Sequence, residues 1–152
     1  MNGSASPGQY TQEEHISRVQ FDPEDQRMPT GSGNRVLVVD DERMIADTLT
    51  LILNRSGYHA HAAYSGEDAI ELAGSLKPDI LVSDVVMGGM SGIEVAIYFA
   101  NYLPKCRIIL ISGNIMTASL LEVAGKQGYQ FQLLPKPVHP QVLISHLSGP
   151  KA

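Results

Sequence analysis

Polar side chains that could act together in chemistry follow short apolar runs at several places in this sequence. They are Asp40, Asp41, Asp84, Ser112 and Lys136. Three carboxylates held close together repel one another and need a cation to neutralise them. Carboxylate oxygens are ligands that Mg²⁺ prefers. Because a carboxylate beside such a metal can attack phosphorus, these residues could together accept a phosphoryl group.

The apolar runs before these side chains have the length and composition of strands, and helical patterns separate them. Val36–Val39 is a continuous run of the kind found in strands buried on both faces. The predicted strands are Val36–Val39, Tyr58–Ala63, Ile80–Asp84, Arg107–Ile111 and Tyr129–Leu134. Apolar residues recur at helical spacing after each of them, with Ser65 as a predicted N-cap and Gly57 as a predicted residue just after a helix.

Five strand–helix units in succession predict an α/β fold. Strands that alternate with helices form a doubly wound parallel sheet with helices on both faces, because the connections are right-handed crossovers. Ligands of such folds bind outside the carboxyl ends of the strands. The polar side chains named first all stand at these ends, so we expect them to meet at one edge of the sheet.

Each of these residues also has a simpler explanation when it is taken alone. Residues 40–42 could be acidic residues that favour a helix N-terminus, since negative charge is stabilising there. Ser112 could cap the fourth helix, and Lys136 could be a solvated loop lysine. We favour a shared site because all of them stand at strand ends.

Four segments in order resemble the bacterial receiver domain of two-component response regulators. They read RVLVVDDE, DILVSDVVMGGMSG, ILISGN and LLPKPV, and the resemblance runs from residue 35 to about 147. It implies a five-stranded sheet with the flavodoxin-like order 2-1-3-4-5. It also implies that Asp84 is the phosphoacceptor and that Mg²⁺ is the cofactor. Its implied ligands are Asp84 and Asp41 directly, Asp40 largely through water, and the backbone carbonyl of Val86.

The resemblance also implies roles for residues on the later strands, and it has departures. Ser112 would contact the phosphoryl group, and Lys136 would form its salt bridge, with a cis peptide bond between Lys136 and Pro137. Leu133 stands where an aromatic residue is common, so an aromatic readout is not implied for this chain. Gly88 stands where a proline usually shapes the loop after the phosphoacceptor, which predicts a more mobile loop.

The resemblance and the composition together predict the organisation of the chain. Residues 1–34 are rich in Gly, Ser and Pro and are expected to form a disordered tail, and residues 35–149 form the receiver domain. Because the sequence stops soon after Lys136, we expect a single-domain regulator. It would take phosphate from a histidine kinase or a phosphotransfer protein and signal to a downstream protein by protein–protein contacts. Its only enzymatic chemistry would be its own phosphorylation and dephosphorylation.

Composition excludes other classes of protein. The 152 residues are 43% hydrophobic and 18% charged, enough apolar material for a core. A formal net charge of −5 disfavours direct nucleic-acid binding, which depends on Lys and Arg. The apolar runs are too short to span a membrane. A single cysteine, Cys106, cannot form an internal disulfide, so a reducing compartment, the cytoplasm, is expected.

Three other functional interpretations fit the sequence less well than a receiver domain. A magnesium-dependent phosphatase with an aspartate nucleophile would want a second aspartate two residues after the first, where this chain has Val86. A flavin-binding domain would need a phosphate-cradling loop where this chain has acidic residues 40–42. A pseudo-receiver, acting as an interaction module without phosphorylation, is disfavoured by the complete set of site residues but stays open.

Overall fold

The computed structural model describes residues 34–113 and 117–148. The chain divides between Gly33 and Asn34 into two units, and the fold described below belongs to the second unit. The predicted disordered tail of residues 1–34 lies outside the described residues, apart from Asn34.

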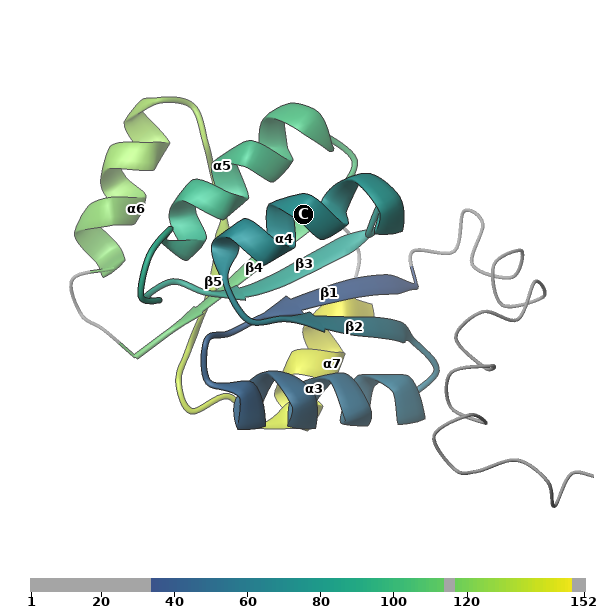
Figure 1. Cartoon of the computed structure of the whole chain (residues 1–152). Helices are drawn as coiled ribbons and strands as arrows, with labels where there is room; N and C mark the ends of the chain where they lie inside the picture. Colours follow the sequence, from purple (N-terminus) through teal and green to yellow (C-terminus); the bar gives the residue numbers. More distant parts are fainter. Residues whose placement is uncertain (1–33, 114–116, 149–152) are drawn as a thin grey trace, which may run out of the picture. The chain divides into compact units, whose positions relative to one another are not determined.

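Strands and helices alternate along the described residues, as the sequence predicted (Figure 1). The strands are β1 (Arg35–Val39), β2 (His59–Ala63), β3 (Ile80–Asp84), β4 (Arg107–Ser112) and β5 (Gln132–Pro135). The helices are α3 (Arg43–Arg55), α4 (Gly66–Leu76), α5 (Gly92–Tyr102), α6 (Thr117–Lys126) and α7 (Pro140–Ser148).

The strands form one parallel sheet in the order β2-β1-β3-β4-β5, which confirms the predicted order. The register places the carboxyl ends of the central strands next to one another. Val39 of β1 pairs with Ser83 of β3, and Asp84 pairs with Ile111 of β4. The residue that follows each of these strands therefore emerges at the same edge of the sheet.

Helices cover both faces of the sheet, with α3 and α7 on one face and α4, α5 and α6 on the other (Figure 1). On the first face, Leu53 of α3 and Leu143 of α7 pack in one core cluster with Val36 and Val38 of β1. On the second face, helix residues such as Phe99 of α5 pack in a cluster with residues of the same strand. Val36–Val39 of β1 are buried and all four are apolar, because helices cover both faces of the strand.

The fifth strand is shorter than the sequence predicted. It begins at Gln132, whereas the pattern of apolar residues placed its start at Tyr129. The Tyr129 backbone N–H donates to the Ala124 carbonyl at 3.0 Å and so helps to close the end of α6, with Gly128 before it at a φ of 98°. The rings of Tyr129 and Phe131 stack on each other and pack with α5 and α6 residues. These residues therefore serve the helix layer before the chain enters the sheet.

A close approach of the backbone fixes the start of α5 against the end of β3. The Gly92 N–H donates to the Val85 carbonyl at 2.8 Å. A Cβ atom at Gly92 would overlap the backbone carbonyl of Asp84. Ser91 caps the helix in a reciprocal capping box with Glu94. Only glycine fits at position 92, and the segment after β3 is thereby held in place.

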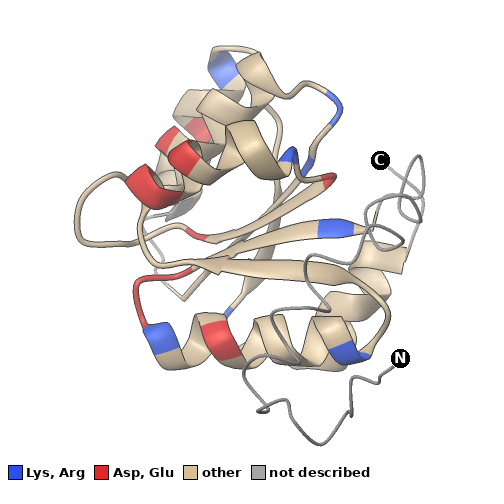
Figure 2. Cartoon of the chain, turned by 45° about the vertical axis from the view of Figure 1, so that its right-hand side comes forward, with Lys and Arg blue, Asp and Glu red and all other residues tan. Residues whose placement is uncertain are grey.

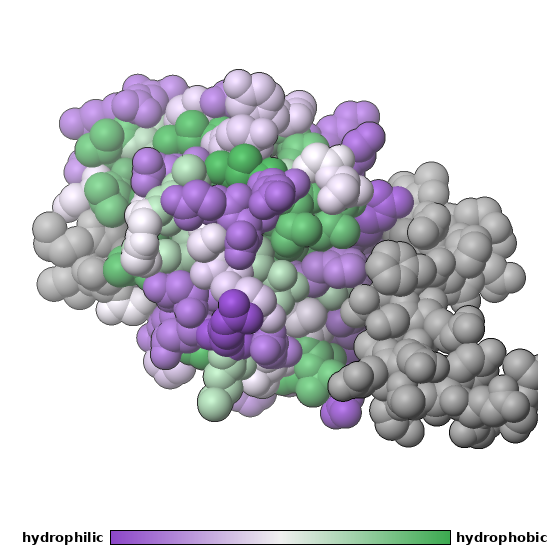
Figure 3. Space-filling view, in the orientation of Figure 1, coloured by the Kyte–Doolittle hydropathy of each residue, from purple (hydrophilic) through white to green (hydrophobic). Residues whose placement is uncertain are grey.

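The surface seen in Figure 3 carries apolar residues in separate patches among hydrophilic ones. Some large apolar side chains are exposed on helices of both layers, such as Met44 on α3 and Val123 on α6. Within the described ranges, 34–113 and 117–148, the helices are too short or too polar to cross a membrane.

Candidate functional site

The first two acidic residues lie between β1 and α3 and do not serve the helix N-terminus. Helix α3 has no acidic residue in its first turn, and its N-cap, Glu42, makes no side-chain capping hydrogen bond. Asp40 accepts a hydrogen bond from the Glu42 backbone N–H at 2.9 Å through Oδ1. Asp40 is 4% exposed, so this local bond holds a buried carboxylate at the end of the strand.

Three carboxylates meet at the carboxyl edge of the sheet. Asp40, Asp41 and Asp84 each offer an oxygen, and these oxygens all lie within 4.8 Å of one another. Asp84 is 8% exposed, whereas Asp41 is exposed to solvent. Acidic segments gather at this end of the sheet (Figure 2). Hard oxygen donors with one side open to water form the kind of site that Mg²⁺ prefers, so the residues present fit this metal.

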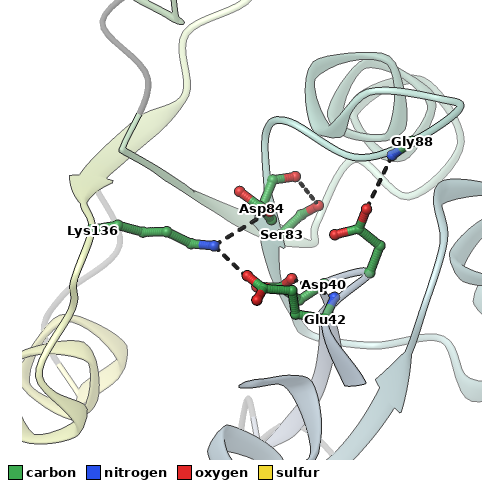
Figure 4. Close-up of polar contacts among 7 residues, drawn as sticks. Asp40, Glu42, Ser83, Asp84, Gly88 and Lys136 are labelled. Atoms are coloured by element: carbon green, nitrogen blue, oxygen red, sulfur yellow. Dashed lines mark hydrogen bonds and ion pairs between the residues drawn. The ribbon is translucent and has the colours of Figure 1, made fainter. Parts of the chain in front are cut away.

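Lys136 supplies the positive charge of the site (Figure 4). Its Nζ lies 3.3 Å from Asp40 Oδ2 and 3.4 Å from Asp84 Oδ2. The Lys136 backbone N–H donates to the Ser112 carbonyl at 3.0 Å, which ties the segment after β5 to the end of β4. The Lys136–Pro137 peptide bond is cis, as predicted. Lys136 is therefore an ion-paired residue of the site and not a solvated loop lysine.

Burial and neighbouring charges shift the titration of the central pair. Burial raises the pKa of the Asp84 carboxyl, and the charge of Asp40 raises it further. The Lys136 ammonium and the Val86 backbone N–H oppose this shift without cancelling it. For Lys136, burial lowers the pKa, but Asp84 and Asp40 outweigh burial and the net shift is upward. The ammonium thus stays charged, while Asp84 is more basic than a free aspartate and a correspondingly better nucleophile.

The acidic cluster opens into a surface pocket that holds most of the predicted site. The pocket is lined by Asp41, Glu42, Asp84, Val86, Ser112, Gly113 and Lys136. Ser112 is buried at the end of β4, five residues before α6 begins, so it is not the N-cap of that helix. The Val86 side chain is about half exposed at 51%. Asp40 is not among the lining residues and lies behind the pocket, in contact with Lys136.

Some contacts of the site were not found by reasoning from the sequence. The Gly88 backbone N–H donates to Asp41 Oδ2 at 3.1 Å (Figure 4), and the Ser83 hydroxyl donates to the Asp84 carbonyl at 2.9 Å. Sequence patterns identify side chains with chemical functions, and a backbone N–H has no such signal. The only trace of the first contact is that residue 88 is a glycine, which keeps its N–H, at a position where the resemblance leads one to expect proline.

The fold and the site define an α/β protein with an acidic pocket at the carboxyl edge of a five-stranded parallel sheet. Residues 36–148 match a family described as the response regulator receiver domain. The match covers more than half of the chain. The chain therefore belongs to this family and contains the receiver domain of a response regulator in two-component signalling.

Solved structures agree with this assignment. The response regulator protein TrrA from Thermotoga maritima, in complex with Mg²⁺ and BeF, is 29% identical with a TM-score of 0.65, over 75% of this chain and 96% of that one. The chemotaxis protein CheY4 from Vibrio cholerae is 26% identical with a TM-score of 0.66, over 74% and 94%. A CheY-like receiver domain protein from Methanospirillum hungatei is 22% identical with a TM-score of 0.68, over 75% and 90%, and supports the fold alone.

Proposed function

We propose that this chain is a phosphorylated response regulator in which Asp84 accepts the phosphoryl group. One observation carries the proposal. The Asp84 carboxylate is buried at the end of β3, paired with a lysine ammonium and close to two further carboxylates. An ion pair alone would need one carboxylate. The additional acidic pair creates a charge that a divalent cation is suited to neutralise.

Mg²⁺ would be held by Asp41 and Asp84, with Asp40 acting largely through water and the backbone carbonyl of Val86 as a further ligand. When bound, the metal would neutralise charge on the equatorial phosphoryl oxygens. The proposal is supported by the oxygen donors of the three aspartates and by the complex of the Thermotoga maritima regulator with Mg²⁺ and BeF.

In the proposed step, an Asp84 carboxylate oxygen attacks phosphorus of a phosphohistidine or a small acyl phosphate. One P–O bond forms, the bond from phosphorus to the donor breaks, and the donor leaves with the electron pair and takes up a proton. Lys136 would pair with the transferred group, and the Ser112 hydroxyl would donate a hydrogen bond to it. The chain would catalyse only this transfer and the hydrolysis of the resulting aspartyl phosphate, in which water attacks phosphorus and inorganic phosphate leaves, and it would not act as an enzyme on other substrates.

We expect the phosphate to come from a histidine kinase or a phosphotransfer protein, and the signal to pass to a downstream protein. A new phosphoryl group adds roughly −1.5 to −2 charge. Ser112 and Lys136 respond to that charge, and they precede α6 and follow β5, respectively. These elements carry exposed apolar side chains, Leu120, Val123 and Leu133, which a partner protein could cover. The proposed readout is therefore a change at this surface.

Intact mass measurement after incubation with acetyl phosphate and Mg²⁺ tests the proposal. The wild type should gain the mass of one phosphoryl group, and mild base should remove it. Asp84→Asn should gain none, because an amide does not attack phosphorus. Asp68→Asn is the matched control, since this aspartate is exposed in the first turn of α4 and should leave labelling unchanged.

Two outcomes would reject the assignment. Equal labelling of wild type and Asp84→Asn would show that another residue is phosphorylated. A wild type that stays unlabelled with acetyl phosphate, and also with a panel of phosphorylated histidine kinases, would favour the pseudo-receiver.

A further inference from the structure

A backbone amide of the loop after β3 contacts the acidic cluster directly. The Gly88 N–H donates to Asp41 Oδ2 at 3.1 Å, across 47 positions of sequence (Figure 4). Asp41 is the exposed member of the cluster, whereas Asp40 and Asp84 are buried. The carboxylate with the greatest freedom to move is therefore the one that the loop holds.

The loop that presents this amide is itself fixed at both ends. At its start, Met87 packs partly buried against the core cluster beneath α4 and α5. At its end, Met90 packs on the first residue of α4, where a Cβ atom at Gly66 would come within 2.9 Å of the Met90 Cβ. The Gly89 N–H donates to the Met87 carbonyl at 3.1 Å, which closes a tight turn around Gly88. The Gly88 N–H is thus presented from well-packed structure on either side.

We infer that the Gly88 backbone amide is a positioning group of the metal site, which orients Asp41 for a divalent cation. The inference rests on the proposed function, since it assumes that Asp41 is a metal ligand. It assigns to residue 88 a role that depends on its N–H and on no side chain. Any residue except proline could supply the N–H, and proline would abolish it.

The physical reason is preorganisation. A carboxylate has two oxygens and about four acceptor sites, so Asp41 can keep the Gly88 hydrogen bond and still bind a cation. Without that bond, the exposed side chain samples several rotamers, and metal binding must restrict it. Restricting one side chain of this kind weakens binding by about three- to tenfold.

Three variants separate the N–H from other properties of residue 88. Gly88→Pro removes the N–H. Gly88→Ala keeps it, and its Cβ would meet Asp41 Oδ2 at an ordinary contact distance of 3.9 Å. Replacing the Met87–Gly88 amide bond by an ester, with glycolic acid at position 88, removes the N–H and adds no ring to the loop, although it also weakens the Met87 carbonyl as an acceptor for the Gly89 N–H.

The test is the Mg²⁺ affinity of the full chain after removal of metal by a chelator, measured by calorimetry and by backbone NMR. We expect binding about three- to tenfold weaker for Gly88→Pro and for the ester, and unchanged within about twofold for Gly88→Ala. Asp41→Asn as a single substitution should move the Gly88 amide proton resonance upfield relative to the wild type, since the charged acceptor is lost.

The outcomes distinguish this inference from the proposed function. If the wild type binds Mg²⁺ and Asp41→Asn does not, but Gly88→Pro and the ester bind as the wild type does, the inference is wrong and the proposed function stands. If Gly88→Ala is weakened as much as Gly88→Pro, the loop backbone and not the N–H is responsible, and the inference is again wrong. If the wild type binds no Mg²⁺, both are wrong.

Discussion

Asp84 is a buried carboxylate whose surroundings disfavour its ionised form. Burial and the neighbouring Asp40 raise its pKa, and Lys136 compensates only in part. A carboxyl with a raised pKa in the folded state favours folding when it is protonated. This contribution is present at low pH and is lost as pH rises from the unfolded pKa through the folded pKa. At neutral pH, Asp84 therefore reduces the stability of the protein.

Asp84→Asn should accordingly stabilise the metal-free protein at neutral pH. The amide removes a buried negative charge and keeps an acceptor for Lys136. The advantage of the variant should shrink as pH falls and Asp84 of the wild type becomes protonated. Urea unfolding of both proteins with a chelator present, from neutral pH down to about pH 4, measures the difference. A variant less stable than the wild type at neutral pH would contradict this account of the site.

Among the elements, α5 starts in contact with the backbone of Asp84. Gly92→Ala would place a methyl group on the Asp84 carbonyl, and the helix or the strand end would have to move. We expect a loss of about 3 kcal/mol or more of unfolding free energy, since the obstacle is backbone and not a flexible side chain. Urea denaturation measures it.

Gly74→Ala is the matched control for that experiment. Gly74 lies inside α4, and a Cβ atom there meets nothing within 4 Å. Alanine is favoured over glycine inside a helix, so this variant should gain roughly 0.5–1 kcal/mol. A loss for Gly74→Ala as large as that for Gly92→Ala would mean that the close approach at Asp84 does not explain the effect.

Among the helices and strands, the sequence was most informative for elements that lie fully inside the sheet. The predicted Ile80–Asp84 is β3 without change, and Ser65 caps α4 as predicted, because buried β-branched runs and capping residues act locally. The start of β5 was missed because Tyr129 and Phe131 have strand-like side chains but are recruited by α5 and α6. That choice depends on packing between distant segments. The Gly88 contact was missed for a different reason, since it uses only the backbone.

For the whole molecule, a cation bound at the site would raise the free energy of unfolding. A ligand that binds only the folded state raises the unfolding free energy by about 1.4 kcal/mol when its concentration is tenfold above the Kd. We expect Mg²⁺ to raise the Tm of the wild type progressively. Asp41→Asn should lose this effect while remaining folded, since Asp41 is exposed and the amide oxygen still accepts from Gly88. Calorimetric melting with and without Mg²⁺ measures both, and a full metal shift in the variant would exclude Asp41 as a ligand.

The reach of Lys136 has a consequence for how the protein is made. Its ammonium pairs with Asp40 across 96 positions of sequence, between the end of β1 and the segment after β5. During synthesis, the carboxylates at the ends of β1 and β3 are complete long before their lysine leaves the ribosome. Contacts between such distant segments must wait for loop closure, so they are late steps in folding. Until Lys136 has been synthesised, the carboxyl edge of the nascent sheet thus carries negative charge that no lysine neutralises. The chain therefore cannot assemble its site before its fold is nearly complete.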